Sequence, residues 1–172
     1  PALAVGAPRA HNNAGAVYLL ILDDADWSAR SATELSSSSR SAAALDLEGH
    51  PSSANAQSQL GDSFGATMAP LGDVDGNGVP DLAVGAPGDD DGAADAGAVH
   101  VLLLGAGGSG GAIGVLSHAK LSTSTIAGAP APLSGGLFGL GLSALGDVNG
   151  DRVVELVVGR SEFKDERGEI AF

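Results

Sequence analysis

The sequence has no cysteine, few aromatic residues and little positive charge. The absence of cysteine excludes disulfide bonds and thiolate metal sites, although it does not fix the cellular compartment. The formal net charge of −13 argues against binding to the phosphates of nucleic acids. No apolar stretch approaches the ~20 residues that are needed to span a bilayer, so we expect no membrane insertion by this segment.

Glycine is abundant, with 27 residues among 172, and much of the 44% hydrophobic content is alanine. A glycine inside a helix costs about 1 kcal/mol relative to alanine, so this composition argues against long helices. Short strands joined by many tight turns fit better. A chain of this length and apolar content can bury a core of ordinary domain size.

Residues 73–81 place oxygen-bearing side chains at the first, third, fifth and ninth positions of a nine-residue segment: Asp73, Asp75, Asn77 and Asp81. The alternation directs every second side chain into one hollow, and the intervening glycines allow a sharp turn. This pattern suits Ca²⁺, which takes six to eight oxygen ligands. The alternative is an Asp/Asn/Gly-rich turn between strands that binds no ion. An EF-hand is excluded because its twelfth position would be Val84, within an apolar strand.

The same pattern returns at residues 147–155, as part of a longer internal repeat. Residues 80–87 (PDLAVGAP) match residues 1–8 (PALAVGAP) and, more weakly, residues 154–161 (VELVVGRS). Phe64-Gly65 matches Phe138-Gly139, and both phenylalanines precede the matched glycine by 21 residues (85 − 64 and 159 − 138). This identical spacing through an acidic loop predicts identical geometry.

Two further sets of matches complete the repeated unit. A third strand is predicted at residues 14–19, 96–101 and 167–172, and a polar, peripheral fourth strand at residues 31–36 and 117–122. Each unit therefore contains four short strands. Such a unit cannot bury both faces of its own sheet, so we expect it to need neighbours stacked on each side.

The order Phe-Gly, acidic loop, Leu-Ala-Val-Gly-Ala-Pro and Gly-Ala-Val resembles the FG-GAP repeat of integrin α-subunit β-propellers, over essentially the whole chain. The resemblance implies an all-β fold of propeller blades, each with four antiparallel strands. It divides the chain into a partial blade with a linker (1–50), a complete blade (51–130) and the first three strands of another (131–172). Because about seven such blades usually close the ring, we expect the chain to be an internal piece of a larger propeller.

In that family the acidic loop binds Ca²⁺, and the resemblance implies two ligand sets here. The first comprises the side chains of Asp73, Asp75, Asn77 and Asp81 with the carbonyl of Val79. The second comprises Asp147, Asn149, Asp151 and Glu155 with the carbonyl of Val153. Arg152 replaces a turn glycine in the second loop, and its Cβ penalises a left-handed backbone, so we expect weaker binding there. A turn without an ion stays open as the alternative at both loops.

Several other residues carry expectations of their own. Residues 88–95 form an acidic loop at the opposite edge of the sheet from the cation loops. We expect a solvated hairpin there, with a partner contact or an extra cation as alternatives. His100 and Trp27 are expected to pack rather than to perform chemistry, and Phe64 and Phe138 to fill the joints between adjacent blades.

The sequence offers little support for catalysis. The serine run at residues 36–39 is not a nucleophile elbow, because no Gly-x-Ser-x-Gly motif surrounds it, and the glycine run from 105 to 111 lacks the lysine of a phosphate loop. We therefore expect a non-enzymatic, secreted or cell-surface module for adhesion or scaffolding. Its structural Ca²⁺ sites fill at millimolar extracellular concentrations even if they are weak. The expected partners are neighbouring blades, in the same or another chain, and an extracellular protein or glycan. The alternatives are a non-catalytic accessory propeller of a secreted hydrolase, a glycan-binding module and a fibre subunit.

Overall fold

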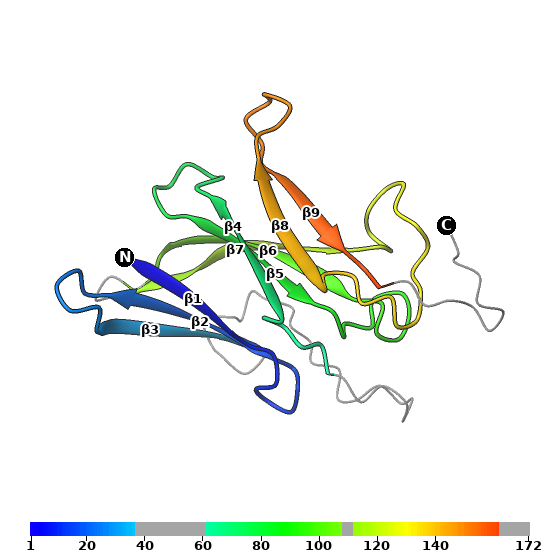
Figure 1. The fold of residues 1–172 in the computed structure, drawn as a ribbon, viewed down its shortest axis with the longest axis horizontal. Helices are drawn as coiled ribbons and strands as arrows, with labels where there is room; N and C mark the ends of the chain where they lie inside the picture. Colours follow the sequence, from blue (N-terminus) through cyan, green and yellow to red (C-terminus); the bar gives the residue numbers. More distant parts are fainter. Residues whose placement is uncertain (37–60, 108–111, 162–172) are drawn as a thin grey trace.

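The structure, a computed structural model, describes residues 1–36, 61–107 and 112–161. The regular structure of these residues is entirely β, with nine strands in three antiparallel sheets (Figure 1). Within the same residues there is no helix long and apolar enough to cross a membrane. The expectation of an all-β fold is confirmed.

Strand order within each sheet follows chain order, because each strand pairs with the one before it. The first sheet contains β1 (Ala2–Ala7), β2 (Ala16–Leu22) and β3 (Ala29–Ser36). The second contains β4 (Thr67–Gly72), β5 (Asp81–Ala86), β6 (Ala98–Ala106) and β7 (Ile113–Ser122). The third contains β8 (Gly141–Gly146) and β9 (Glu155–Gly159). The second sheet thus has the four antiparallel strands that the repeat predicts.

The blade limits at residues 1–50, 51–130 and 131–172 stay predictions. The boundary between residues 50 and 51 falls within residues 37–60, which lie outside the described residues. The strand predicted at 167–172 also lies outside the described residues.

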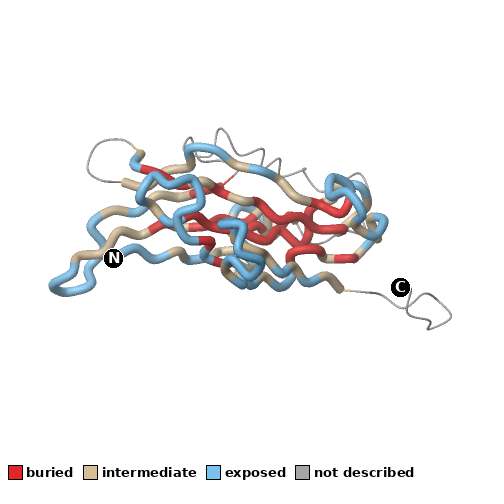
Figure 2. The backbone as a smooth tube through the Cα atoms, turned by 90° about the horizontal axis from the view of Figure 1, so that it is seen from above, coloured by how far each residue is buried: buried red, intermediate tan, exposed pale blue. Residues whose placement is uncertain are grey.

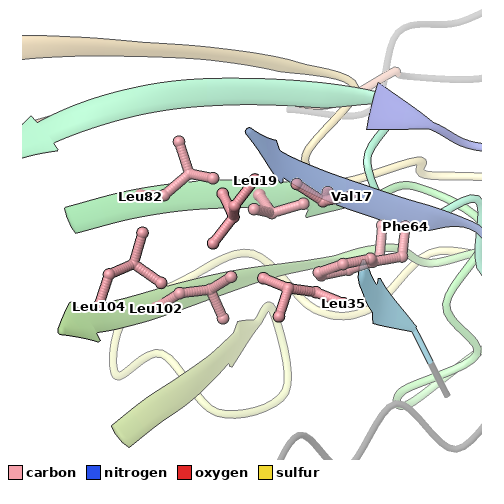
Figure 3. Close-up of a cluster of buried hydrophobic side chains, with 9 residues drawn as sticks. Val17, Leu19, Leu35, Phe64, Leu82, Leu102 and Leu104 are labelled. Carbon is pink, nitrogen blue, oxygen red and sulfur yellow. The ribbon is translucent and has the colours of Figure 1, made fainter. Parts of the chain in front are cut away.

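The middle sheet is buried on both of its faces, and its strand β5 is buried along its whole length (Figure 2). Leu82 and Val84 pack with residues of the first sheet, whereas Ala83 packs with residues that lead into and form the third. Figure 3 shows the first of these two cores, which contains Val17, Leu19, Leu35, Phe64, Leu82, Val84, Ala86, Leu102 and Leu104. The apolar pattern of β5 therefore serves two interfaces at once.

Each joint between sheets is formed by the Phe-Gly pair that begins a repeat. Phe64 forms an isolated parallel bridge to Gly15 of the first sheet, and Phe138 forms the same bridge to Gly97 of the second. A Cβ on Gly15 or Gly97 would overlap the carbonyl oxygen of the facing phenylalanine. Both phenylalanine side chains are buried, at 1% and 9% exposed. They fill the joints between sheets, as expected from the sequence.

Candidate metal centres in two matched loops

The two acidic loops leave their sheets in the same way. The β4–β5 register shifts between Pro70 and Gly72, and the β8–β9 register shifts between Ala144 and Gly146. Asp81 and Glu155, the ninth residues of the two loops, are paired opposite the glycines that follow these shifts. The same irregularity in the ladder therefore precedes both loops.

The first loop is folded around its own carboxylates. The backbone N–H groups of Asn77 and Gly78 donate to Asp73 at 2.9 and 2.8 Å. The N–H of Val74 donates to Asp81 at 2.8 Å, which connects the start of the loop to its end. The N–H of Asn77 also donates to Asp75 at 3.1 Å.

The second loop repeats most of these hydrogen bonds at matched positions, although the N–H of Gly150, not that of Asp151, donates to Asp147. The N–H of Arg152 donates to Asp147 at 2.8 Å, and the N–H of Val148 donates to Glu155 at 2.7 Å. The residue types at the third and fifth positions are swapped between the loops. Asp75 and Asn77 in the first loop correspond to Asn149 and Asp151 in the second. Each loop therefore keeps three carboxylates and one amide.

The three carboxylates of each loop converge. In each group, carboxylate oxygens lie within 4.8 Å of one another, and the groups are Asp73, Asp75 and Asp81, and Asp147, Asp151 and Glu155. In the first group only Asp81 is buried, at 1% exposed. A cluster of hard oxygen donors, open to solvent on one side, matches what Ca²⁺ requires and offers nothing to a metal that prefers sulfur or imidazole.

The remaining predicted ligands are the carbonyls of Val79 and Val153. The side chain of Val79 packs against the core between the first two sheets, whereas that of Val153 is exposed. The assignment of these carbonyls as ligands stays a prediction.

Arg152 adopts the strained backbone that the sequence suggested. Its φ is 71°, whereas Gly78 at the corresponding position has a φ of 88°. A non-glycine residue in the left-handed region costs roughly 1–2 kcal/mol. The second loop therefore carries a conformational cost that the first loop avoids.

Sequence comparison identifies the repeat that holds the first loop. The FG-GAP repeat family matches residues 64–102, from the buried phenylalanine through the acidic loop and into β6. This segment of the chain is therefore similar to an FG-GAP repeat. Integrin alpha-PS2 from Drosophila melanogaster is 39% identical to it over 106 residues, which is 59% of this chain and 7% of that protein. The chain thus spans a small part of an integrin α-like relative, and its four-stranded sheet is a β-propeller blade.

The loop at residues 88–95 lies at the opposite edge of this blade and is not the solvated hairpin that we expected. Asp89 is 6% exposed, and its carboxylate accepts from Lys120 of β7 at 2.8 Å. The hydroxyl of Ser122 donates to Asp91 at 2.7 Å. Burial opposes the charge of Lys120, but the hydrogen bond that it donates to Asp89 and the nearby carboxylates raise the pKa of its ammonium group above its ordinary value.

Lys120 is a residue that the sequence reading missed. The sequence feature that could have indicated its ion pair is a single lysine in a peripheral strand of a strongly acidic chain. Because Lys120 follows the acidic loop by 25 or more residues, only the register of β6 and β7 brings the two together.

His100 packs as expected, and Trp27 does not. The His100 ring is 1% exposed and meets Phe64 edge to face, with ring centroids 5.4 Å apart and an interplanar angle of 84°. Within the described residues its Nδ1 has no hydrogen-bond partner. Trp27 is 69% exposed in the turn before β3, so its expected packing role is wrong for this structure.

Proposed function

We propose that this chain is part of a calcium-stabilised β-propeller of a secreted or cell-surface protein, and that it works in adhesion or scaffolding rather than in catalysis. The observation that carries the proposal is the pair of matched loops. Each loop gathers three carboxylates beside an amide oxygen, and the loops occur in repeats similar to those of an integrin α subunit.

The ion of each loop has a structural role in this proposal. Asp73, Asp75, Asn77, Asp81 and the Val79 carbonyl hold the first ion. Asp147, Asn149, Asp151, Glu155 and the Val153 carbonyl hold the second. Two carboxylates at 4.8 Å repel each other by about 1 kcal/mol even in bulk water, and a divalent ion reverses that sign. The chain contributes ligands fixed by hydrogen bonds to the loop backbone, and the ion contributes charge neutralisation.

The partners proposed for the chain are further blades and an extracellular ligand. The outer faces of the first and third sheets expose apolar side chains, including Leu3, Val5, Leu145 and Val157. Additional blades, in the same or another chain, are the natural cover for these faces because the middle blade is covered in that way. An extracellular protein or glycan then binds the assembled ring.

Thermal unfolding of the full-length protein tests the calcium proposal. We expect millimolar Ca²⁺ to raise the melting temperature relative to EGTA, because an ion at 100 times its Kd stabilises the folded state by about 2.7 kcal/mol. The double variant Asp73→Ala/Asp75→Ala should lose part of this gain. A matched control is Asp24→Ala, an exposed aspartate outside both loops, which should keep the whole gain. Identical melting curves of the wild-type protein in Ca²⁺ and in EGTA would refute the structural ion.

A further inference from the structure

On the side that faces β5, the end of β6 is bound by side chains of the first loop instead of by a strand. The N–H of Leu104 donates to Oδ1 of Asp81 at 2.8 Å, and the carbonyl of Leu104 accepts from Nδ2 of Asn77 at 2.7 Å. Leu104 is 4% exposed and belongs to the core between the first two sheets (Figure 3). Two loop side chains therefore satisfy both peptide groups of one buried residue, and we call this pair of bonds the Leu104 bridge.

The register of the sheet explains why a backbone partner is missing. Leu82 of β5 lies opposite Leu102 of β6, and continuing that register by two residues brings Pro80 opposite Leu104. Proline has no N–H, so it cannot donate to the carbonyl of Leu104. Because buried backbone groups must be paired, the amide of Asn77 supplies the donor that Pro80 lacks.

In the first repeat the corresponding strand end has no acidic residue beside it. Leu22 corresponds to Leu104, and its N–H donates to the carbonyl of Pro1 at 2.9 Å, which is an ordinary backbone bond. Ala2 stands there in place of Asp81. In the second repeat the carboxylate of Asp81 takes over this N–H, so the strand end depends on the loop.

Asn77 has a chemistry suited to two partners. Its Oδ1 accepts from the N–H of Val79 at 2.8 Å, while its Nδ2 donates to Asp75 at 2.9 Å as well as to Leu104. All three contacts require the same orientation of the amide. A flipped amide would place its NH₂ against the N–H of Val79 and its oxygen against the oxygens of Asp75 and Leu104. An amide can offer its oxygen to a cation and its N–H to β6, whereas an aspartate can do only the first.

The other side of β6 gives this strand end less support. The β6–β7 register shifts between Leu103 and Leu104, at the position of the Leu104 bridge. Beyond it lie Gly105 and Gly107, the latter donating to the carbonyl of Ala112 at 2.8 Å. An irregular ladder that contains and is followed by glycines depends strongly on any additional bond.

We propose that Asn77 and Asp81 couple the first cation loop to β6, so that an ion in the loop stabilises the end of the β6–β7 hairpin. The ion rests on the function proposed above, whereas the bridge rests on its own hydrogen bonds. Asn77 is then a positioning residue. Asparagine at the fifth position of the loop has a role of its own and is not merely a weaker cation ligand than aspartate. In the third repeat that position is Asp151, whose side chain has no N–H to donate.

Hydrogen exchange at the Leu104 amide in the full-length protein tests the coupling, with Ca²⁺ binding measured separately by calorimetry. The variant is Asn77→Asp, which keeps an oxygen ligand and loses the donor. The matched control is Asn149→Asp, the same chemical change in the second loop, where Nδ2 contacts Asp151. In wild-type protein we expect Ca²⁺ to slow exchange at Leu104 by at least about tenfold, the effect of roughly one hydrogen bond to a charged group.

In Asn77→Asp we expect Ca²⁺ to bind without slowing this exchange, and in EGTA we expect exchange about tenfold faster than in the wild type. Asn149→Asp should match the wild type in both conditions. Equal slowing by Ca²⁺ in the wild type and in Asn77→Asp, or an equal effect of Asn149→Asp, would overturn the coupling and leave calcium binding intact. Absence of Ca²⁺ binding in the wild type would refute the proposed function and the coupling together. Equal exchange of the wild type and Asn77→Asp in EGTA would overturn the part of Asn77 in the Leu104 bridge.

Discussion

Acidification should destabilise this protein through His100. The ring is buried and packs edge to face against Phe64, so a charged imidazolium at this position would lose its hydration. Burial is the main cause, with repulsion from Lys120 and His118 next, and together they lower the pKa of His100 from 6.5 to about 3. A neutral histidine packed in the core is therefore the folded form at every pH near neutrality.

The sign and size of the effect follow from the two pKa values. Below pH 6.5 the unfolded chain binds a proton at His100, and the folded protein does not do so until about pH 3. The free energy of unfolding therefore falls as the pH falls through this window, by up to about 1.4 kcal/mol per pH unit. Between pH 7 and pH 5 the loss from this one group is about 2 kcal/mol.

Urea unfolding of the wild type and of His100→Leu, both in EGTA, isolates this contribution. Other groups titrate in both proteins, so the difference between their pH profiles reports His100. Leucine removes the titration while keeping an apolar side chain of moderate size at this position. We expect the variant to lose about 2 kcal/mol less than the wild type between pH 7 and pH 5. Parallel profiles of the two proteins would refute the argument that the folded state excludes the proton.

Three substitutions test other parts of the structure. Arg152→Gly should stabilise the second loop by about 1 kcal/mol in chemical denaturation, because it relieves the left-handed backbone at φ 71°; a loss of stability would contradict the strain. Gly85→Ala should cost about 1–3 kcal/mol, because its Cβ would overlap a carbonyl oxygen of the next repeat. Gly141→Ala, with open space at its Cβ, is its control and should cost far less. Asp89→Ala should cost about 1–3 kcal/mol and speed proteolysis of the loop at residues 88–95, because it leaves Lys120 without its carboxylate; an unchanged cleavage rate would show that the ion pair does not hold the loop.

The strand pattern and the joints could be predicted because the sequence repeats them. Phe64 and Phe138 precede matched glycines by the same distance, and the N–H of Gly65 and Gly139 donates to Gly85 and Gly159 at 3.0 Å in both copies. The convergence of carboxylates in the cation loops could be predicted for a similar reason. Their ligands are contiguous, so local spacing is enough to bring the carboxylates together.

Contacts that depend on strand register were not predictable in this way. Asn77 and Leu104 are 27 residues apart, and their contact depends on how β5 and β6 are aligned. The ion pair of Asp89 with Lys120 likewise needs the alignment of β7 against β6. Pro80 was the one local clue, because a proline at the start of a buried strand leaves a carbonyl on the neighbouring strand without a donor.

Matched positions in the first and second repeats can be compared to show how much a neighbouring sheet buries. Leu3 and Leu82 occupy the same repeat position and differ in exposure, at 49% and 7%, and Val5 and Val84 differ likewise, at 41% and 0%. The residue types are identical, so the difference reflects the sheet that covers the second repeat and is missing from the corresponding face of the first. Full burial of such side chains is worth about 1.5–3 kcal/mol each, so the open face leaves roughly half of that unused at each position. A preceding blade that places its own β6-like strand over Leu3 and Val5 would recover this energy. The exposed Val157 of the third repeat matches Ala83, which packs toward the following sheet, so a following blade would cover Val157 in the same way.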